Sequence, residues 1–226
     1  MSYAARLRIV SLFEDLEADE LSRIAELCSL HRYEKQAQIF DENESTSDVF
    51  FVLAGSVRIS SYAMSGREIT YRDVSIGGIF GEFAAVDGLP RSAAVLALSD
   101  CTLARMSSAR FTELLQNNGR VAVRLIETLV AKIRGMSERV FEVSALGIRE
   151  RVRKELLRLA AQGSSDPSGV LIKPAPTHYE IAARIGSHRE AVTREFNRLE
   201  DAGVIEIRRQ EIRIKDIRRL AALEEA

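Results

Sequence analysis

The sequence contains no tryptophan, two cysteines and three histidines among its 226 residues. Cys28 and Cys101 lie far apart and belong to no C-x-x-C pair, so the sequence predicts neither a disulfide framework nor an iron–sulfur cluster. The histidines form no H-x-H pair, and only His31 lies in the N-terminal half, so no metal ion and no haem is expected. No nucleophile with a neighbouring base is visible, and the sequence therefore argues against an enzyme.

Long hydrophobic runs are also absent. No apolar run approaches the roughly 20 residues that a membrane-spanning helix needs, and acidic residues follow the N-terminus too closely for a signal peptide. Hydrophobic residues make up 46% and charged residues 29% of the chain, as in an ordinary globular protein. We therefore expect a cytoplasmic protein without membrane contact, folded as one large domain or two small ones.

The hydrophobic pattern changes from helical to β-rich near residue 38. Within residues 12–30, apolar residues recur at helical spacing, which predicts a short amphipathic helix. Between about 38 and 108, short β-rich runs such as DVFFVLAGSVRI are separated by Gly, Ser and Asp. Evenly spaced runs of this kind are typical of an antiparallel barrel or roll.

A long helical stretch is predicted from near Ser108 to about Leu146, where Gly147 ends it. Residues along it step by three and four and form a heptad-like seam: Val123, Ile126, Val130, Ile133, Ser137, Val140 and Ser144. Such a seam packs either on the chain's own barrel or on a second copy of the helix. We favour self-pairing, and hence a homodimer.

The last part of the chain, residues 147–226, contains 16 Lys and Arg against 13 Asp and Glu, a weak sign of an anionic partner. A helix is expected at 148–162, followed by the turn-rich loop QGSSDPSG. Two capping boxes come next, Thr177-x-x-Glu180 and Ser187-x-x-Glu190, with Gly186 between them where a helix stop belongs. Two short helices joined by a tight glycine turn form a helix-turn-helix, and the alternating isoleucines of VIEIRRQEIRIKD predict a β-hairpin wing.

The second helix of this motif has an apolar and a polar face. Val192, Phe196 and Leu199 share the apolar side. The polar side carries residue types suited to base edges, because Arg pairs with guanine, Glu with cytosine and Asn with adenine. The Arg-Arg-Gln tip of the wing is placed to reach phosphates. The sequence therefore predicts a reader of double-stranded DNA with these contact residues: Thr177, His178, Ser187, Arg189, Glu190, Thr193, Arg194, Asn197, Arg208 and Arg209.

Two motifs carry a resemblance to a known family. Arg189-Glu190-x-x-x-Arg194 before a hairpin wing resembles the helix-turn-helix of the CRP/FNR family of bacterial transcription regulators. FGEFAAVDGLPRSAAV resembles the phosphate-binding cassette of that family's cyclic-nucleotide-binding domain, and DVFFVLAGSVRI and GREITYRDVSIGGIFGE resemble the strands before it. The resemblance covers nearly the whole chain. It implies an α+β fold: an N-terminal antiparallel β-roll, or cupin-like jelly roll, in residues 1–108, a dimerisation helix in 109–146, and a winged helix-turn-helix in 147–226.

The same resemblance implies a cyclic-nucleotide site. Arg91 would clamp the phosphate, because a planar guanidinium meets two of its oxygens at once. Backbone N–H groups near Gly81 would approach the same phosphate, and Glu82 would accept a hydrogen bond from the ribose 2′-hydroxyl. The effector would be cAMP or cGMP, and the expected ligand-binding residues are Gly81, Glu82, Phe83, Arg91, Ser92, Ala93, Lys132 and Ser137. The alternative is an Arg91–Glu82 ion pair that only staples the loop.

The long helix departs from the family pattern at the nucleotide site. Met136-Ser137 stand where cAMP-responsive members have a Thr-Ser pair that reaches the adenine. Met136 cannot donate a hydrogen bond as threonine does, so the choice between cAMP and cGMP stays open. Lys132 stands where the family has an arginine near the pocket.

The resemblance further implies how such a protein works. A homodimer would read a two-fold symmetric operator with half-sites roughly 34 Å apart, and RNA polymerase would be a partner. Ligand binding would bias the long helix and a hinge near Ser144–Gly147. The rival hypothesis is a constitutive DNA-binding protein whose roll serves only dimerisation. A redox or gas sensor and a cupin-type enzyme are disfavoured by the shortage of cysteine and histidine.

Overall fold

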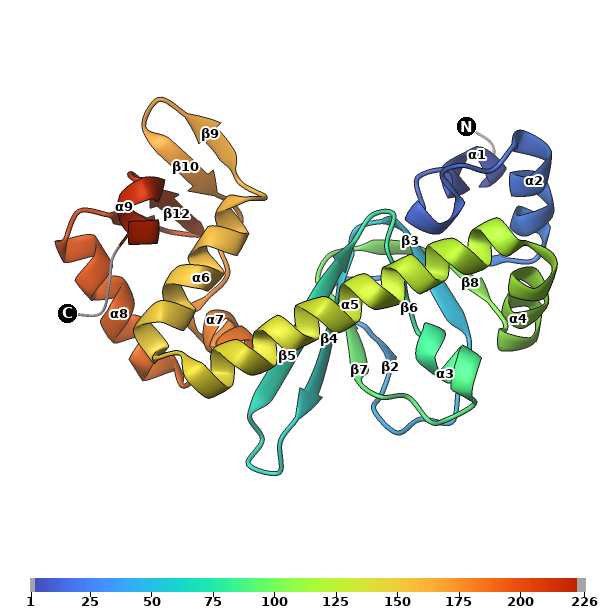
Figure 1. Cartoon of the computed structure of the whole chain (residues 1–226), viewed down its shortest axis with the longest axis horizontal. Coiled ribbons are helices and arrows are strands. Elements are labelled where there is room, and N and C mark those ends of the chain that lie inside the picture. The colour runs from blue at the N-terminus through green and yellow to red at the C-terminus, as the bar shows by residue number, and fades with distance from the viewer. Residues whose placement is uncertain (1–2, 223–226) are drawn as a thin grey trace. The chain divides into compact units, whose positions relative to one another are not determined.

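The computed structural model describes residues 3–222, and Figure 1 shows its elements in chain order. The helices are α1 Tyr3–Leu7, α2 Ala18–Glu26, α3 Glu82–Asp87, α4 Ser108–Asn117, α5 Gly119–Ala145, α6 Ile148–Ala160, α7 His178–Ile185, α8 Arg189–Asp201 and α9 Ile217–Ala222, with a 3-10 turn at Ser11–Phe13. The strands are β1 Ser29–Tyr33, β2 Gln38–Phe40, β3 Val49–Ala54, β4 Ser56–Tyr62, β5 Glu68–Ser75, β6 Ile79–Phe80, β7 Ala94–Ala97, β8 Cys101–Met106, β9 Ser164–Asp166, β10 Gly169–Ile172, β11 Ile205–Arg208 and β12 Glu211–Ile214. By its internal contacts the chain divides into two units, Met1–Ile133 and Arg134–Ala226.

The first unit is an antiparallel β-roll, as predicted. Its strands form two four-stranded sheets, ordered β1-β8-β3-β6 and β2-β7-β4-β5. Side chains from both sheets meet in one core, in which the rings of Phe50 and Phe80 stack at 5.1 Å and Phe40 lies beside them. Along β3 the side chains alternate: Phe50 and Val52 face this core, whereas Phe51 packs on the helices outside the sheet.

The N-terminal helix is shorter than predicted. α2 ends at Glu26, and the residues from Ser29 onward form β1, whereas the sequence pattern predicted helix to residue 30. All five residues of β1 pair with β8, from Ser29 opposite Arg105 to Tyr33 opposite Cys101. This pairing with a distant strand overrides the local helical spacing.

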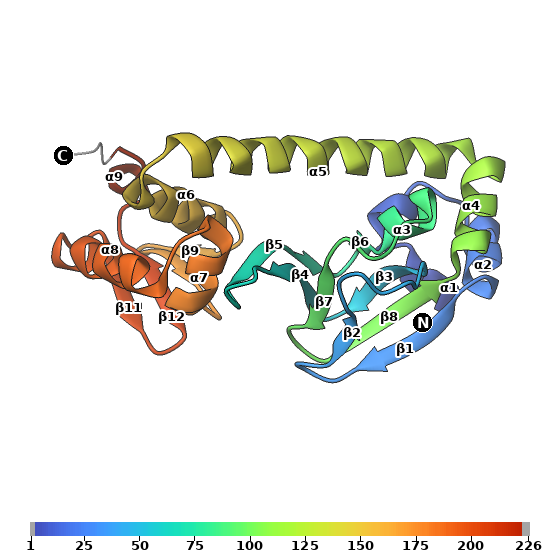
Figure 2. The same cartoon turned by 90° about the horizontal axis from the view of Figure 1, so that it is seen from below.

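The predicted long helix is two helices. Asn118 is extended between α4 and α5, and Figure 2 shows the helix axis turning there. The Asn118 side chain accepts a hydrogen bond from the Val121 amide at 3.2 Å, and so caps the start of α5. No helix in the described part of the chain is long and apolar enough to span a membrane.

The second unit is a winged helix-turn-helix around its own core. α6, α7 and α8 pack on a four-stranded sheet of order β11-β12-β10-β9. The centre of this core consists of fully buried side chains, including Leu156, Ile181 and Phe196. The segment predicted as a turn-rich loop is a β-hairpin, β9–β10, because Gly169 and its neighbours pair with β9 on one side and β12 on the other.

Candidate functional sites

The helix-turn-helix is built as its sequence indicates up to the turn. Thr177 caps α7: its hydroxyl accepts a hydrogen bond from the Glu180 amide, and the Glu180 carboxylate accepts one from the Thr177 amide at 2.8 Å. Gly186 ends α7 in the left-handed conformation, at φ 63°, which favours glycine. α7 and α8 are therefore joined by the predicted tight turn.

The second predicted capping box is wrong. α8 begins at Arg189 with His188 as the N-cap residue, and no side chain caps it. Ser187 lies one position too early and is buried, and its hydroxyl has no hydrogen-bond partner among the described residues. A buried Ser187 cannot contact DNA without rearrangement, so it no longer belongs among the candidate contact residues.

The two faces of α8 are as predicted. Val192, Phe196 and Leu199 are fully buried in the core of the second unit. The side chains on the opposite face that are exposed to solvent are Arg189, Glu190, Arg194 and Asn197. The start of α8 thus presents two cations, a carboxylate and an amide in one row, a set that can read base edges.

Thr193 is not freely available in this row, because His178 at the start of α7 binds it. The His178 Nδ1 lies 2.9 Å from the Thr193 hydroxyl, which also donates to the Arg189 carbonyl at 3.0 Å. The imidazole packs against the Phe196 ring at 4.7 Å. Burial lowers the pKa of His178, and the nearby Arg189 charge lowers this pKa further.

This depressed pKa makes stability depend on pH. The unfolded chain protonates His178 near pH 6.5, whereas the folded protein does so only at lower pH. Stability from this residue is therefore fully present above about pH 6.5 and is lost as pH falls through the folded-state value. We expect His178→Gln to reduce the fall in thermal midpoint between pH 7 and pH 5. An unchanged pH profile of the melting curves would contradict this assignment.

The wing forms from β11 and β12, with Arg208, Arg209 and Gln210 at its tip. All three are exposed, but Arg208 forms an ion pair with Glu206 at 2.6 Å. Arg209 is therefore the better-placed phosphate contact of the predicted pair.

The predicted phosphate cassette encloses α3 in the first unit. Gly81 has φ 81°, and a Cβ there would lie 2.7 Å from the Asp48 carbonyl oxygen and 2.9 Å from Nη1 of Arg91. Only glycine fits this position. Arg91 itself is buried and donates three hydrogen bonds within the protein. They go to Thr46 Oγ1 at 3.0 Å and to the carbonyls of Gly81 and Asp48 at 3.0 and 2.9 Å.

Glu82 does not pair with Arg91. The buried Glu82 carboxylate accepts a hydrogen bond from Nζ of Lys132 on α5 at 2.5 Å. The predicted residues Glu82, Arg91 and Lys132 therefore do lie in one region, but with Lys132 as the counter-ion. Of the other predicted ligand contacts, Phe83, Ser92 and Ser137 are exposed and Ala93 is buried.

Sequence reasoning missed Arg72 in this region. Its guanidinium donates to the Ile79 carbonyl at 3.2 Å, two residues before Gly81. Burial lowers the pKa of Arg72, and it lowers the pKa of Lys132, while the Glu82 carboxylate opposes both changes. Arg72 shares the side of β5 that carries the buried Val74, and an arginine at such an inward position was the available signal.

Three desolvated cations lie around the Glu82 carboxylate. Arg72, Arg91 and Lys132 all feel its charge, Arg91 also feels the carboxylates of Asp48 and Glu44, and burial lowers the pKa of Arg91 too. Desolvated cations favour an anionic ligand. A cavity of about 230 Å³ lies nearby, between residues 45–47, α3 and Gly88–Pro90, but none of these charged residues lines it.

Comparison with known proteins agrees with both units. Residues 30–118 match the model of the cyclic nucleotide-binding domain, and residues 150–223 match that of the Crp-like helix-turn-helix domain. The chain is 30% identical over 181 residues to the cAMP-activated global transcriptional regulator CRP of Haemophilus influenzae, covering 79% of this chain and 80% of that protein. It is 28% identical over 206 residues to the cAMP-activated global transcriptional regulator Vfr of Pseudomonas aeruginosa, covering 88% and 95%.

Solved structures show the same fold. The c-di-GMP responsive global regulator CLP of Xanthomonas campestris superposes with a TM-score of 0.80 at 20% identity, over 88% of this chain and 100% of that one. A mutant of CooA from Carboxydothermus hydrogenoformans gives a TM-score of 0.80 at 20% identity, over 94% of each chain. Fold and sites define a DNA-binding transcription regulator with a cyclic-nucleotide-binding domain. The chain belongs to the CRP/FNR family of transcription regulators.

Proposed function

We propose that this regulator binds DNA as a homodimer and that a cyclic nucleotide in the β-roll controls its affinity for a two-fold symmetric operator. The single observation that carries the DNA-reading role is the exposed row at the start of α8, backed by a fully buried apolar face. Arg189 would read a guanine, Glu190 a cytosine, and Arg194 and Asn197 would extend the contact. Arg209 and the N-terminus of α7, at Thr177 and His178, would contact phosphates.

The effector role is supported by the charge of the cassette. Three buried or half-buried cations, Arg72, Arg91 and Lys132, lie around the Glu82 carboxylate, and burial lowers the pKa of each, so a phosphodiester charge would stabilise their charged forms. Ligand binding requires Lys132 to share or release Glu82, and Arg91 to turn part of its guanidinium from the carbonyls toward the phosphate. cAMP is the first candidate because CRP and Vfr are cAMP-activated, and cGMP is the second.

A specific observation favours the constitutive alternative. Arg91 already has three protein acceptors and Glu82 already has Lys132, so the cassette is internally satisfied without a nucleotide. A regulator that uses the roll only as a scaffold would keep these contacts permanently. If Arg189 and Glu190 read bases as in the family they resemble, a TGTGA-like half-site is the first to try. Titrating a symmetric operator of such half-sites with and without cAMP or cGMP, at one fixed salt concentration, separates the two hypotheses.

The base-reading role of Arg189 gives a sharper test. Arg189→Ala should weaken operator binding by about 1–3 kcal/mol and relax specificity at one base pair per half-site. Arg209→Ala is the contrast, because loss of a phosphate contact should weaken binding to all sequences about equally. Electrophoretic mobility titrations on single-base variants of the operator measure both. An equal loss on every sequence for Arg189→Ala would reject base reading.

A further inference from the structure

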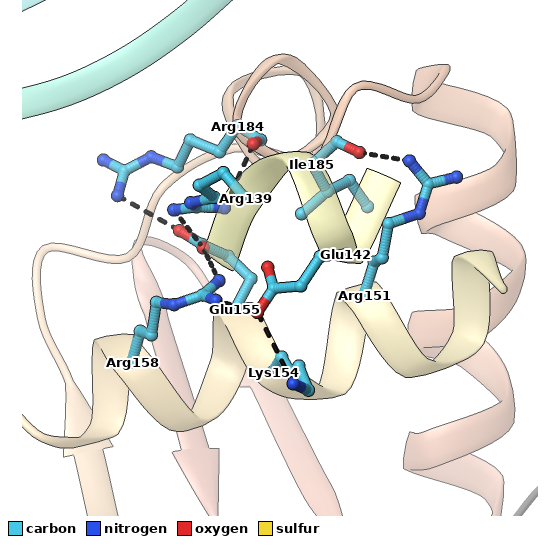
Figure 3. A network of polar contacts seen from close by, with 8 residues as sticks. All are labelled: Arg139, Glu142, Arg151, Lys154, Glu155, Arg158, Arg184 and Ile185. Carbon is cyan, nitrogen blue, oxygen red and sulfur yellow. Dashed lines mark hydrogen bonds and ion pairs between the residues drawn. The ribbon is translucent and has the colours of Figure 1, made fainter. Parts of the chain in front are cut away.

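A network of polar contacts around two buried carboxylates lies in the second unit and includes none of the exposed residues of α8 (Figure 3). At its centre is Glu155 of α6, which is 1% exposed. Its carboxylate accepts hydrogen bonds from Arg139 of α5 at 2.9 Å, from Arg158 of α6 at 3.3 Å and from Arg184 of α7 at 3.3 Å. One carboxylate therefore joins three helices.

Further contacts reinforce the same junction. Arg139 also donates to the Arg184 carbonyl at 3.1 Å, so its guanidinium binds a side chain of α6 and the backbone of α7. Glu142 of α5 is 4% exposed and pairs with Arg158 and, at 3.6 Å, with Lys154. The end of α5 is thus held on α6 through two separate carboxylates.

The network also reaches the turn of the helix-turn-helix. Arg151 of α6 donates to the Ile185 carbonyl at 2.6 Å, directly before Gly186. This carbonyl is one of the last of α7 and has no acceptor role inside its own helix. The position of α7, and through the turn that of α8, is therefore fixed by side chains of α5 and α6.

The segment of α5 just before the network is held differently. Lys132 is bound to Glu82 of the first unit, and Arg139 is the first residue of α5 bound into the network. Between them lies Gly135, in an exposed helical stretch where a Cβ would meet nothing within 4 Å. Glycine weakens a helix interior relative to alanine, and here no close packing requires it.

We propose that Glu155 is a positioning residue for DNA recognition. It makes residues 139–145 of α5 part of the DNA-reading unit, so that the reading helix keeps a fixed direction relative to the end of α5. The weakly held part of α5 then lies upstream, around Gly135, and not at the 144–147 hinge that the sequence predicted. The inference rests on the proposed dimeric reading for its effect on DNA but not for the contacts themselves.

The first test needs no DNA. Arg139→Met removes the α5 partner of Glu155 and leaves Glu155 with Arg158 and Arg184, while Glu142 keeps Arg158 and Lys154. Amide hydrogen exchange in the full-length variant should accelerate about tenfold or more at residues 139–145, because one of the two carboxylates that hold this segment no longer binds it. The matched control is Arg134→Met, since Arg134 is an exposed arginine of the same helix that forms no ion pair with any described residue. Equal exchange in both variants would overturn the proposal.

The second test measures positioning. One added base pair between half-sites rotates the second site by about 35°, so a dimer with fixed reading helices has a sharp optimum of spacer length. In Arg139→Met and Glu155→Gln, affinity for the operator should depend less on spacer length, whereas Arg134→Met should keep the sharp optimum. Glu195→Gln is a second control, because Glu195 is buried like Glu155 but pairs with Arg198 of α8 and Arg149 of α6, and with no described residue of α5. A lower but unflattened profile in Arg139→Met would mean that the network only stabilises the fold. A flat profile in the unmodified protein would instead reject dimeric reading. The hydrogen-exchange test would then still decide whether Glu155 holds residues 139–145 in the DNA-reading unit.

Discussion

Replacing Ile133 on α5 with glutamate is expected to convert the protein into a monomer and to weaken binding to a symmetric operator by about a hundredfold to ten-thousandfold. The reason is the exposure of the seam in the single chain. Val123, Ile126, Val130 and Ile133 are 55%, 59%, 43% and 62% exposed. An apolar stripe of this length is stable in water only when another surface covers it.

The chain's own roll does not cover the seam. A different stripe of α5 packs on the first unit, with Val121 and Leu125 buried in its core. Of the two hypotheses for the seam, packing on the chain's own barrel is therefore excluded for these residues, and pairing with a second copy remains. Burying an isoleucine in that pairing stabilises it by about 1.5–3 kcal/mol, and burying an unpaired glutamate costs at least as much.

Sedimentation or light scattering at several concentrations measures the dimer, and a mobility titration measures operator binding. Ala131→Glu is the control, because Ala131 is exposed on α5 but lies outside the seam. Ile133→Glu should keep its thermal unfolding cooperative, since the side chain is exposed in the monomer. A variant that stays dimeric at micromolar concentration would show that α5 is not the interface.

The elements that sequence reasoning placed correctly are those defined by local chemistry. The Thr177–Glu180 capping box and Gly186 are set by residues within one turn of each other, and both formed as predicted. The seam of α5 and the buried face of α8 follow from helical period alone.

The misses have the opposite origin, because they depend on partners far away in the sequence. β1 forms because β8 lies beside it, 68 or more positions later for each of its paired residues. Ser187 fails as a cap because α8 starts two residues later, at Arg189. Val192 and Phe196 of this helix are fully buried in the core of the second unit. The Glu155 network requires three helices to be in place before its charges meet.

The candidate effector site shows the same division. The cassette residues Gly81, Glu82 and Arg91 were recognised from their motif. Which cation neutralises Glu82 was not predictable, because Lys132 is 50 residues away and the motif itself contains Arg91. Arg72 was missed because its role depends on the fold, which brings it close enough to feel the charge of the Glu82 carboxylate.

The largest effect on the effector side is expected from Arg91→Ala, which should reduce affinity for cAMP or cGMP by about a hundredfold or more. In the proposed complex, removing the buried guanidinium leaves the phosphate without its bidentate partner. Isothermal titration calorimetry of the full-length protein should then show no heat at concentrations that saturate the unmodified protein. Glu82→Gln tests the same site with a smaller change of shape, because glutamine keeps the size of the side chain but loses the charge that holds Lys132.

The control must separate ligand binding from loop stability, since Arg91 also holds the carbonyls of Gly81 and Asp48. Arg105→Ala serves this purpose: Arg105 of β8 donates to the Asp48 carboxylate at 2.9 Å but lies outside the cassette. It should keep the heat of binding at a comparable loss of thermal midpoint. Undiminished heat of binding in Arg91→Ala would show that Arg91 does not bind the phosphate of the nucleotide. The unmodified protein could instead give no heat with either nucleotide and bind the operator equally with and without them. This result would favour the scaffold hypothesis, in which Glu82 keeps Lys132 and Arg91 keeps its carbonyl partners permanently.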